Sequence, residues 1–285
     1  VTSQPTQAGA AIVGPTVKGP VNIPTVVSSY SDYQNKFGAK VISGSGEYTY
    51  FTSVAAYNYF QQGGDSLLVT RVVSGSYTAA TSSAVDNLDS ISAITLETLA
   101  VGAIQNSTSV EGSKGQLPSG SRDNIRWEII SPDTASGTFS LLIRQGDDIT
   151  NQKKVLETWT NLSLDPNASN YVSRVIGDQK QTVKTDGSTY YLQMEGQYAN
   201  ASRYVRVKSV KSPTLNYFDN AGDPKSQFTS SIPVASEGTF GAALGVDFNG
   251  IVANFNQNIN ATNTQGLQGD NYTTALNLLA NKDEF

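Results

Sequence analysis

The chain has 285 residues and a formal net charge of −5, and it contains neither cysteine nor histidine. Without cysteine it has no disulfide framework. Without histidine, Ser-His-Asp catalysis, Cys-His catalysis and the common histidine zinc sites are excluded. The acidic balance, with no basic stripe along the sequence, argues against nucleic-acid binding.

The length corresponds to about two domains at roughly 150 residues each, and such a chain can bury a sizeable core. No apolar run approaches the roughly 20 residues that a membrane-spanning helix needs, so we expect no membrane insertion. Charged residues are sparse and Ser, Thr, Asn, Gln and Gly are plentiful. The surface is therefore polar but weakly charged, which suits a protein that packs against copies of itself.

The stretch 10–73 has the most specific local pattern in the chain. It opens on an apolar run, Ala10–Val13, that predicts a buried strand. Two Gly-Pro turns follow, in which glycine permits a tight turn and proline fixes φ. A short helix is then predicted, with Ser29 or Ser31 as its N-cap and Gly38 as its C-terminal stop.

A second helix and a strand complete this stretch. The spacing predicts a helix over Tyr50–Phe60 that Gly63-Gly64 stops. Its apolar residues occur on several sides, so we expect more than one neighbour to cover it. Leu67–Val73 is apolar on both faces, which predicts a strand at the centre of a sheet.

The middle of the chain favours strands. Segment 74–92 is rich in Ser, Thr and Ala and is expected to be a loop or a weak helix, and 107–123 is predicted to be a loop. Strands are predicted over Ala93–Ile104, Ile125–Ser131, Thr138–Arg144, Val155–Leu164, Thr189–Glu195 and Arg203–Val210. We expect the last two of these strands to pair with each other.

Two further helices are predicted. Tyr171–Ile176 has helical spacing, with Asn170 as its cap. Near the end, Tyr272, Leu276 and Leu279 recur at i, i+4 and i+7, which is typical of an amphipathic helix.

One segment has the glycine spacing of a phosphate-binding P-loop, which needs a lysine and a hydroxyl residue after its second glycine. Here Gly14 and Gly19 supply the spacing, but Lys18 precedes the second glycine and Pro20, which has no N–H, follows it. We therefore interpret the segment as a structural turn.

Two acidic pairs, Asp147-Asp148 and Asp219 with Asp223, consist of the residue type that binds calcium. Acidic pairs at turns more often shape the turn alone, and no carboxylate pair is placed for glycoside hydrolysis. We predict no enzyme and no catalytic, cofactor-binding or metal-binding residues.

The ordered motifs of the first stretch resemble those of contractile bacteriophage tail sheath proteins, the myovirus tail sheath family. That family typically opens its core with an apolar strand, a G-P-x-x-x-G-P turn, a helix ending in Phe-Gly, a helix ending in Gly-Gly and a strand ending in Val-x-Arg-Val. These parts stand here in order at Ala10–Pro20, Tyr30–Gly38, Tyr50–Gly64 and Leu67–Val73. The later segment Phe139–Arg144, followed by 157–166, resembles a further stretch of the family.

The resemblance implies a structural subunit that polymerises helically around a tail tube and contracts to drive the tube through the host envelope. Its partners would be other sheath subunits, the tail tube and the baseplate, and its location would be the virion after assembly in the host cytoplasm. Head-to-tail contacts between copies produce such open helical arrays. Contraction would move nearly rigid subunits between two packings, without a cofactor.

The family also has an N-terminal arm and a C-terminal domain that we do not find here. We therefore expect a fragment that is monomeric and non-contractile by itself. The predicted fold is α+β, with mixed β-sheets, flanking helices and a β-rich middle region. Residues 1–75 with 240–285 would form a partial α/β sheath core, and residues 76–239 a β-rich middle domain.

The alternative hypothesis is a β-rich phage or cell-surface module that binds glycans through a surface rich in Asn, Thr and Tyr. A clear hit on a glycan array would favour this alternative, whereas tubes formed by the gene product would favour the sheath hypothesis.

Overall fold

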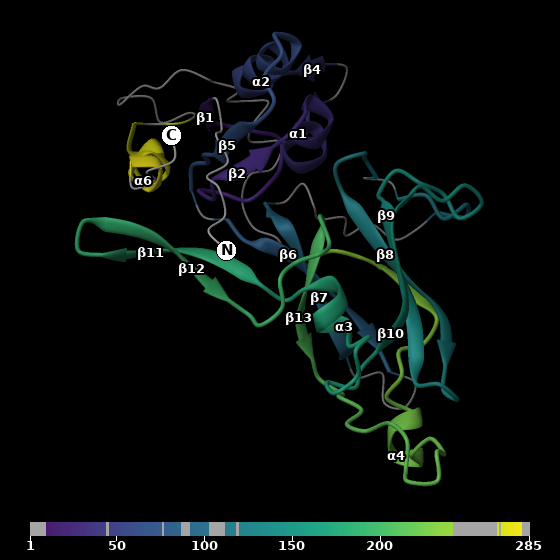
Figure 1. The fold of residues 1–285 in the computed structure, drawn as a ribbon. Coiled ribbons are helices and arrows are strands. Elements are labelled where there is room, and N and C mark those ends of the chain that lie inside the picture. Colours follow the sequence, from purple (N-terminus) through teal and green to yellow (C-terminus); the bar gives the residue numbers. More distant parts are fainter. Residues whose placement is uncertain are drawn as a thin grey trace.

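The computed structural model describes residues 10–43, 46–75, 77–86, 92–102, 112–117, 120–241, 267 and 269–280 (Figure 1). Short helices flank several small sheets, and one sheet combines parallel with antiparallel pairing. The predicted α+β class with mixed sheets is confirmed.

The first sheet has three strands in the order β1-β5-β2. The central strand β5 runs parallel to β1 and antiparallel to β2, and each of its residues is buried, which confirms its predicted central position. The strands are β1 (Ala11–Gly14), β2 (Thr25–Val27) and β5 (Leu67–Arg71).

Two helices, α1 (Tyr30–Phe37) and α2 (Phe51–Gln61), lie beside this sheet (Figure 1). The predicted caps of α1 are confirmed: the Ser29 hydroxyl accepts the N–H of Asp32, and Gly38 ends the helix at φ 74°. The strands β3 (Val41–Ser43) and β4 (Gly46–Tyr48) form a small antiparallel ribbon between the two helices in the sequence.

The expectation that more than one neighbour covers α2 is confirmed, because α2 packs against both β1 and α1, although one side of the helix stays exposed. The buried residues of α2 are the small Thr52, Ser53 and Ala56, and the helix packs against β1 and α1. Phe51, with 67% of its surface exposed, points away from the body. Of the large apolar residues of α2, Tyr59 and Phe60 pack against the core of the first sheet, whereas Phe51, Val54 and Tyr57 are exposed.

The helix α6 (Gly269–Ala280) confirms the predicted C-terminal helix and packs against β1. Its predicted apolar face is wrong in part, because Leu276 is 53% exposed. The buried residues are Tyr272, Ala275 and Leu278, which are spaced at i, i+3 and i+6. The helix therefore turns a neighbouring stripe of its surface toward the sheet.

Two larger antiparallel sheets form the middle of the chain, with strand orders β10-β9-β8-β14 and β13-β7-β6. Their facing sides share one apolar core, in which Ile94 from one sheet and Trp127 and Phe139 from the other are buried. The strands are β6 (Ala79–Val85), β7 (Ser92–Val101), β8 (Ile125–Asp133), β9 (Thr138–Gln145), β10 (Val155–Ser163), β13 (Val205–Val210) and β14 (Ser236–Thr239).

The strand predictions in this region are largely confirmed, with one error. Segment 74–92, expected to be a loop or a weak helix, contains β6, which pairs antiparallel with β7. Its Ala80 and Ala84 are small but fully packed into the shared core, so pairing and burial outweigh weak local propensity. Much of the predicted loop 107–123 lies outside the described residues.

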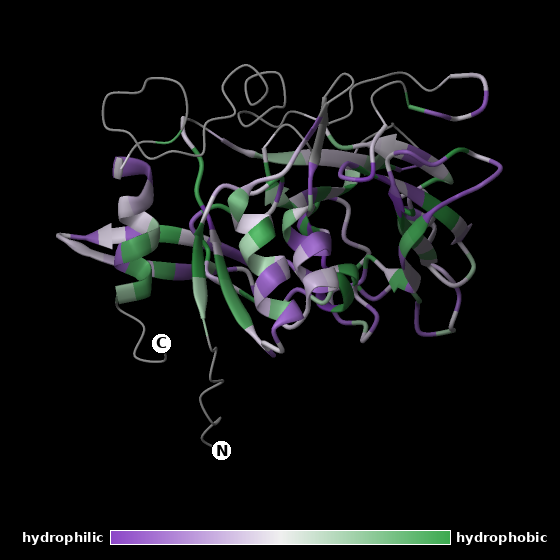
Figure 2. Ribbon diagram, turned by 90° about the horizontal axis from the view of Figure 1, so that it is seen from above, coloured by the Kyte–Doolittle hydropathy of each residue, from purple (hydrophilic) through white to green (hydrophobic). Residues whose placement is uncertain are grey.

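The expected pairing of Thr189–Glu195 with the strand around 203–210 is wrong. Strand β12 (Thr189–Glu195) forms a hairpin with β11 (Lys180–Asp186) through the two-residue loop Gly187-Ser188, whereas β13 pairs with β7. Two-residue loops with glycine at positive φ favour such local hairpins. The hairpin extends from the body beside α6, which contacts β12 (Figures 1 and 2).

Two short helices complete the fold, α3 (Val172–Ile176) and α4 (Ser226–Thr229). The predicted α3 is confirmed, but its predicted cap is wrong. The Asn170 amide donates to the Asn161 carbonyl oxygen at 2.7 Å instead of capping the helix.

The turn that contains the two Gly-Pro pairs requires glycine at its second glycine position, Gly19, and this requirement can be tested. Gly19 has φ 113°, and a Cβ atom there would lie 2.7 Å from Cδ1 of Phe37. We expect Gly19→Ala to lower the free energy of unfolding by about 2–3 kcal/mol, through backbone strain and overpacking. Urea unfolding followed by circular dichroism measures this loss.

The matched control is Gly75→Ala, at a glycine with φ 77° and no atom within 4 Å of a built Cβ. Only backbone strain applies there, so we expect a loss of about 1 kcal/mol. Equal losses in the two variants would contradict the close packing of the turn.

Candidate functional site

The segment with P-loop-like glycine spacing is packed as a structural turn. The backbone N–H of Lys18 donates to the Phe37 carbonyl oxygen at 3.0 Å, and the Thr16 hydroxyl donates to the Lys18 carbonyl oxygen at 2.8 Å. Pro20 follows without an N–H. Within this turn the Lys18 N–H is thus engaged and the two prolines have none to offer a phosphate.

The lysine of this turn, Lys18, forms an ion pair with Asp123. Lys18 is 7% exposed, and its Nζ lies 3.3 Å from Oδ1 of Asp123. Burial lowers the pKa of Lys18, and the neighbouring Asp123 carboxylate opposes that shift. Because Asp123 directly precedes the β8 region, the pair ties the turn to the middle sheets.

A buried arginine joins the two parts of the fold. Nη1 of Arg71, the last residue of β5, donates to the carbonyl oxygens of Gly19 and Val101, both at 2.8 Å. The N–H of Val101 also donates to the Gly19 carbonyl oxygen at 3.2 Å. Burial lowers the pKa of Arg71 to about 10, against the opposing influence of the nearby Tyr50 phenol.

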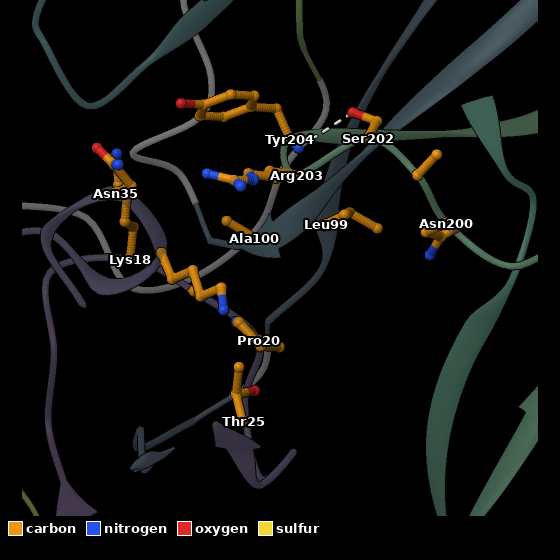
Figure 3. Close-up of a pocket in the computed structure, with 13 residues that line it drawn as sticks. Lys18, Pro20, Thr25, Asn35, Leu99, Ala100, Asn200, Ser202, Arg203 and Tyr204 are labelled. Carbon is orange, nitrogen blue, oxygen red and sulfur yellow. Dashed lines mark hydrogen bonds between the residues drawn. The ribbon is translucent and has the colours of Figure 1, made fainter. Parts of the chain in front are cut away.

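A cavity of about 440 Å³ lies between the turn, the end of β7 and the segment before β13 (Figure 3). In it the Ser202 hydroxyl accepts the N–H of Tyr204 at 3.2 Å. None of the described residues that line it is acidic. They include Lys18, Pro20, Leu99, Ala100, Ser202 and Arg203. Cations beside apolar walls suit recognition of another molecule better than acid–base chemistry.

The first acidic pair is divided between two different environments. Asp148 is fully buried and accepts from Arg144, with Nε to Oδ2 at 2.7 Å and Nη2 to Oδ1 at 3.0 Å. Nη1 of Arg126 adds a contact with Oδ1 at 3.3 Å. Asp147 instead pairs with Lys154 at the surface, at 3.0 Å. Guanidinium groups thus occupy the positions around Asp148 that a cation would take.

The two arginines form a wider network that the sequence reasoning missed. Glu237 on β14 accepts from Arg126 at 3.1 Å and from Arg144 at 2.8 Å, and Glu128 accepts from Arg144 at 2.9 Å. Burial lowers the pKa of Arg144, but hydrogen bonds and charge from Asp148 and the glutamates raise it by more. Arg126 and Arg144 stand directly opposite each other on β8 and β9, at polar positions of alternating strands. Polar residues that alternate with apolar ones along both strands were the sequence signal from which this network could have been predicted.

The second acidic pair shapes a turn. Oδ1 of Asp219 accepts the backbone N–H groups of Asp223 at 2.9 Å and Ala221 at 2.8 Å. These hydrogen bonds, that from Asp223 first, lower the pKa of Asp219. Across the described ranges no group of three or more His, Cys, Asp or Glu residues is placed to hold a metal ion. Among the helices that the structure describes, none has the length and apolar character for crossing a bilayer.

Comparison with known proteins gives limited information. No protein-family model matches the chain, and no curated protein matches it. Two solved structures are similar to parts of it. The sheath tail protein Lin1278 from Listeria innocua is 12% identical with a TM-score of 0.38, over 84% of this chain and 34% of that one. A sheath tail protein from Desulfitobacterium hafniense is 10% identical with a TM-score of 0.27, over 74% and 37%.

The chain thus spans little more than a third of the length of either solved sheath tail protein. Similarities this low assign neither a family nor a function to it.

The Asp148 network gives the second prediction. Asp148→Asn removes the charge between two fully buried guanidinium groups, so we expect the free energy of unfolding to fall by about 3–5 kcal/mol. Asp147→Asn, at the surface pair next to it, should change it by less than about 1 kcal/mol. Urea unfolding of both variants provides the measurement, and equally small losses would show that the buried network contributes little.

Buried phenols give a prediction for alkaline pH. Burial raises the pKa of Tyr50 from 10 to about 12, and it raises that of Tyr33 as well. Between pH 10 and pH 12 the unfolded chain loses these protons first, so the free energy of unfolding falls as the pH rises. The raised pKa values of Tyr204, Tyr217 and Tyr272 act in the same direction, whereas the lowered pKa values of Lys18 and Arg71 act in the opposite one.

We expect Tyr50→Phe to reduce this slope, because one of the contributing phenols is then absent. Denaturant unfolding of wild type and variant at a series of pH values across this range measures the slope. Parallel curves would contradict the role of Tyr50.

Proposed function

We propose that the chain is part of a structural subunit that assembles with copies of itself into a contractile tail sheath. In this proposal the array surrounds a tail tube in the virion and contracts to drive the tube through the host envelope. Its partners would be other sheath subunits, the tube and the baseplate.

The observation that carries the proposal is the exposed apolar stripe of α2. Phe51, Val54 and Tyr57 are 67%, 43% and 45% exposed, and they follow one side of the helix. Tyr30 of α1 extends the stripe, with its ring centroid 5.1 Å from that of Tyr57 in an edge arrangement. Contiguous apolar surface on a soluble protein marks an interaction site. An apolar side of a helix that stays exposed in one chain fits an interface between copies.

The motif residues of the sheath resemblance give further support. Gly19 and Gly38 hold close turns against Phe37 and Val17, and Arg71 joins the first sheet to β7. A unit braced in this way suits a subunit that moves as a rigid body between two packings.

Electron microscopy of the purified full-length gene product that contains this chain tests the proposal, because the chain by itself is expected to be monomeric. We expect helical tubes from the wild type and none from a Phe51→Asp, Tyr57→Asp double variant, since charges on the stripe oppose burial between copies. The matched control is Phe218→Asp, because Phe218 is 44% exposed and lies near α4, at the end of the molecule opposite α2 (Figure 1).

Circular dichroism must show the same fold in all variants. Absence of tubes from the wild type would overturn the proposed function. Tubes from the double variant would overturn the role of the α2 stripe.

A further inference from the structure

Positive charge gathers along one groove of this acidic chain. A second cavity, of about 940 Å³, adjoins the one in Figure 3, and both are lined by Pro20, Thr25, Leu99 and Asn200. We call the two together the basic groove. Glu97 is the one acidic residue among the described residues that line it. Six lining residues are cationic: Lys18, Lys36, Lys180, Arg203, Arg206 and Lys208. The whole chain has a net charge of −5.

The charge excess is centred on Glu97 of β7. Arg206 stands opposite it on β13 and donates to Oε1 from Nε at 3.1 Å and from Nη2 at 2.9 Å. Lys180 lies 3.4 Å from Oε1, and Lys208 lies 3.3 Å from Oε2. One carboxylate faces three cations here, which leaves an excess of two positive charges.

The carboxylate at this centre remains ionised. Burial raises the pKa of Glu97, but the charge and hydrogen bonds of Arg206, with help from both lysines, lower it by more. The two lysine side chains are 44% and 47% exposed, so their ammonium groups face the open groove. The other end of the groove is closer to balance, because Lys18 pairs with Asp123 and Lys36 with Asp32.

The walls between the cations are apolar or neutral. Val21, Leu99, Val183 and Met194 contribute apolar surface. The Thr182 hydroxyl on the same wall is buried without a hydrogen-bond partner within the described part of the chain. The groove therefore combines positive charge, apolar surface and an unused polar group.

From this arrangement we infer that the basic groove binds an acidic, extended segment of a protein chain. Such a segment can place carboxylates at the lysines and apolar side chains at the walls between them. A compact phosphate group requires cations that converge on one point, and here Glu97 occupies that point. The inference rests on the groove alone and does not require helical assembly.

The test uses fluorescence anisotropy with a labelled peptide of Glu, Val and Ser, and a control peptide in which every Glu is Gln. We expect the wild type to bind the acidic peptide, more weakly as salt rises, and to ignore the control peptide. The Lys180→Gln, Lys208→Gln double variant should weaken binding about fivefold to tenfold, the order expected for two partly screened charge contacts.

The matched control is Lys184→Gln with Lys211→Gln. Both lysines are exposed, one lies on β11 and the other directly follows β13, and neither lines the groove. We expect this variant to bind as the wild type does.

Three outcomes would overturn the inference. They are no binding of the acidic peptide by the wild type, equal losses in the two double variants, and tighter binding of a single-stranded oligonucleotide than of the peptide. The last outcome would assign the groove to phosphate-rich polymers instead.

Discussion

The contact on which the rest of the structure depends is that between the Arg71 guanidinium and the carbonyl oxygens of Gly19 and Val101. It joins the first sheet, the Gly-Pro turn and the end of β7 at one buried point. Burial of the charge is unfavourable, since it lowers the pKa of Arg71 to about 10 and leaves Nε and Nη2 without hydrogen-bond partners among the described residues. Without the guanidinium the Gly19 carbonyl would keep only the N–H of Val101, and the Val101 carbonyl would lose its bond to Arg71, so the junction constrains its neighbours on both sides.

The shape of the basic groove follows from this junction. The turn that presents the Gly19 carbonyl also places Pro20 on one wall, and the end of β7 that presents the Val101 carbonyl places Leu99 on another. Strand β13 then brings Arg206 beside Glu97, because its antiparallel register with β7 sets these two residues opposite each other. The backbone arrangement around the junction therefore positions the charged residues of the basic groove.

Sequence reasoning succeeded for several local signals. The Ser29 cap and the Gly38 stop of α1 each depend on residues within a few positions, and both were predicted correctly. Two local features were predicted wrongly, the β11–β12 hairpin and the Asn170 cap, and β6 was missed because its distant partner β7 makes it a strand. The basic groove could be predicted only in part: Arg203, Arg206 and Lys208 lie in one short basic stretch, whereas Lys18, Lys36 and Lys180 come from distant segments that only the fold brings to the same groove.

The α2 stripe and the basic groove differ in physical character, so salt should affect binding at the two surfaces differently. The α2 stripe is apolar, so burying it is favourable in proportion to area and hardly responds to salt. The basic groove attracts through charge, and at about 0.15 M ionic strength screening restricts that attraction to roughly 8 Å. Charge contacts mainly set which partner binds and how fast, whereas apolar burial supplies affinity. A protein with both surfaces can therefore keep its apolar contact while salt weakens the charged one.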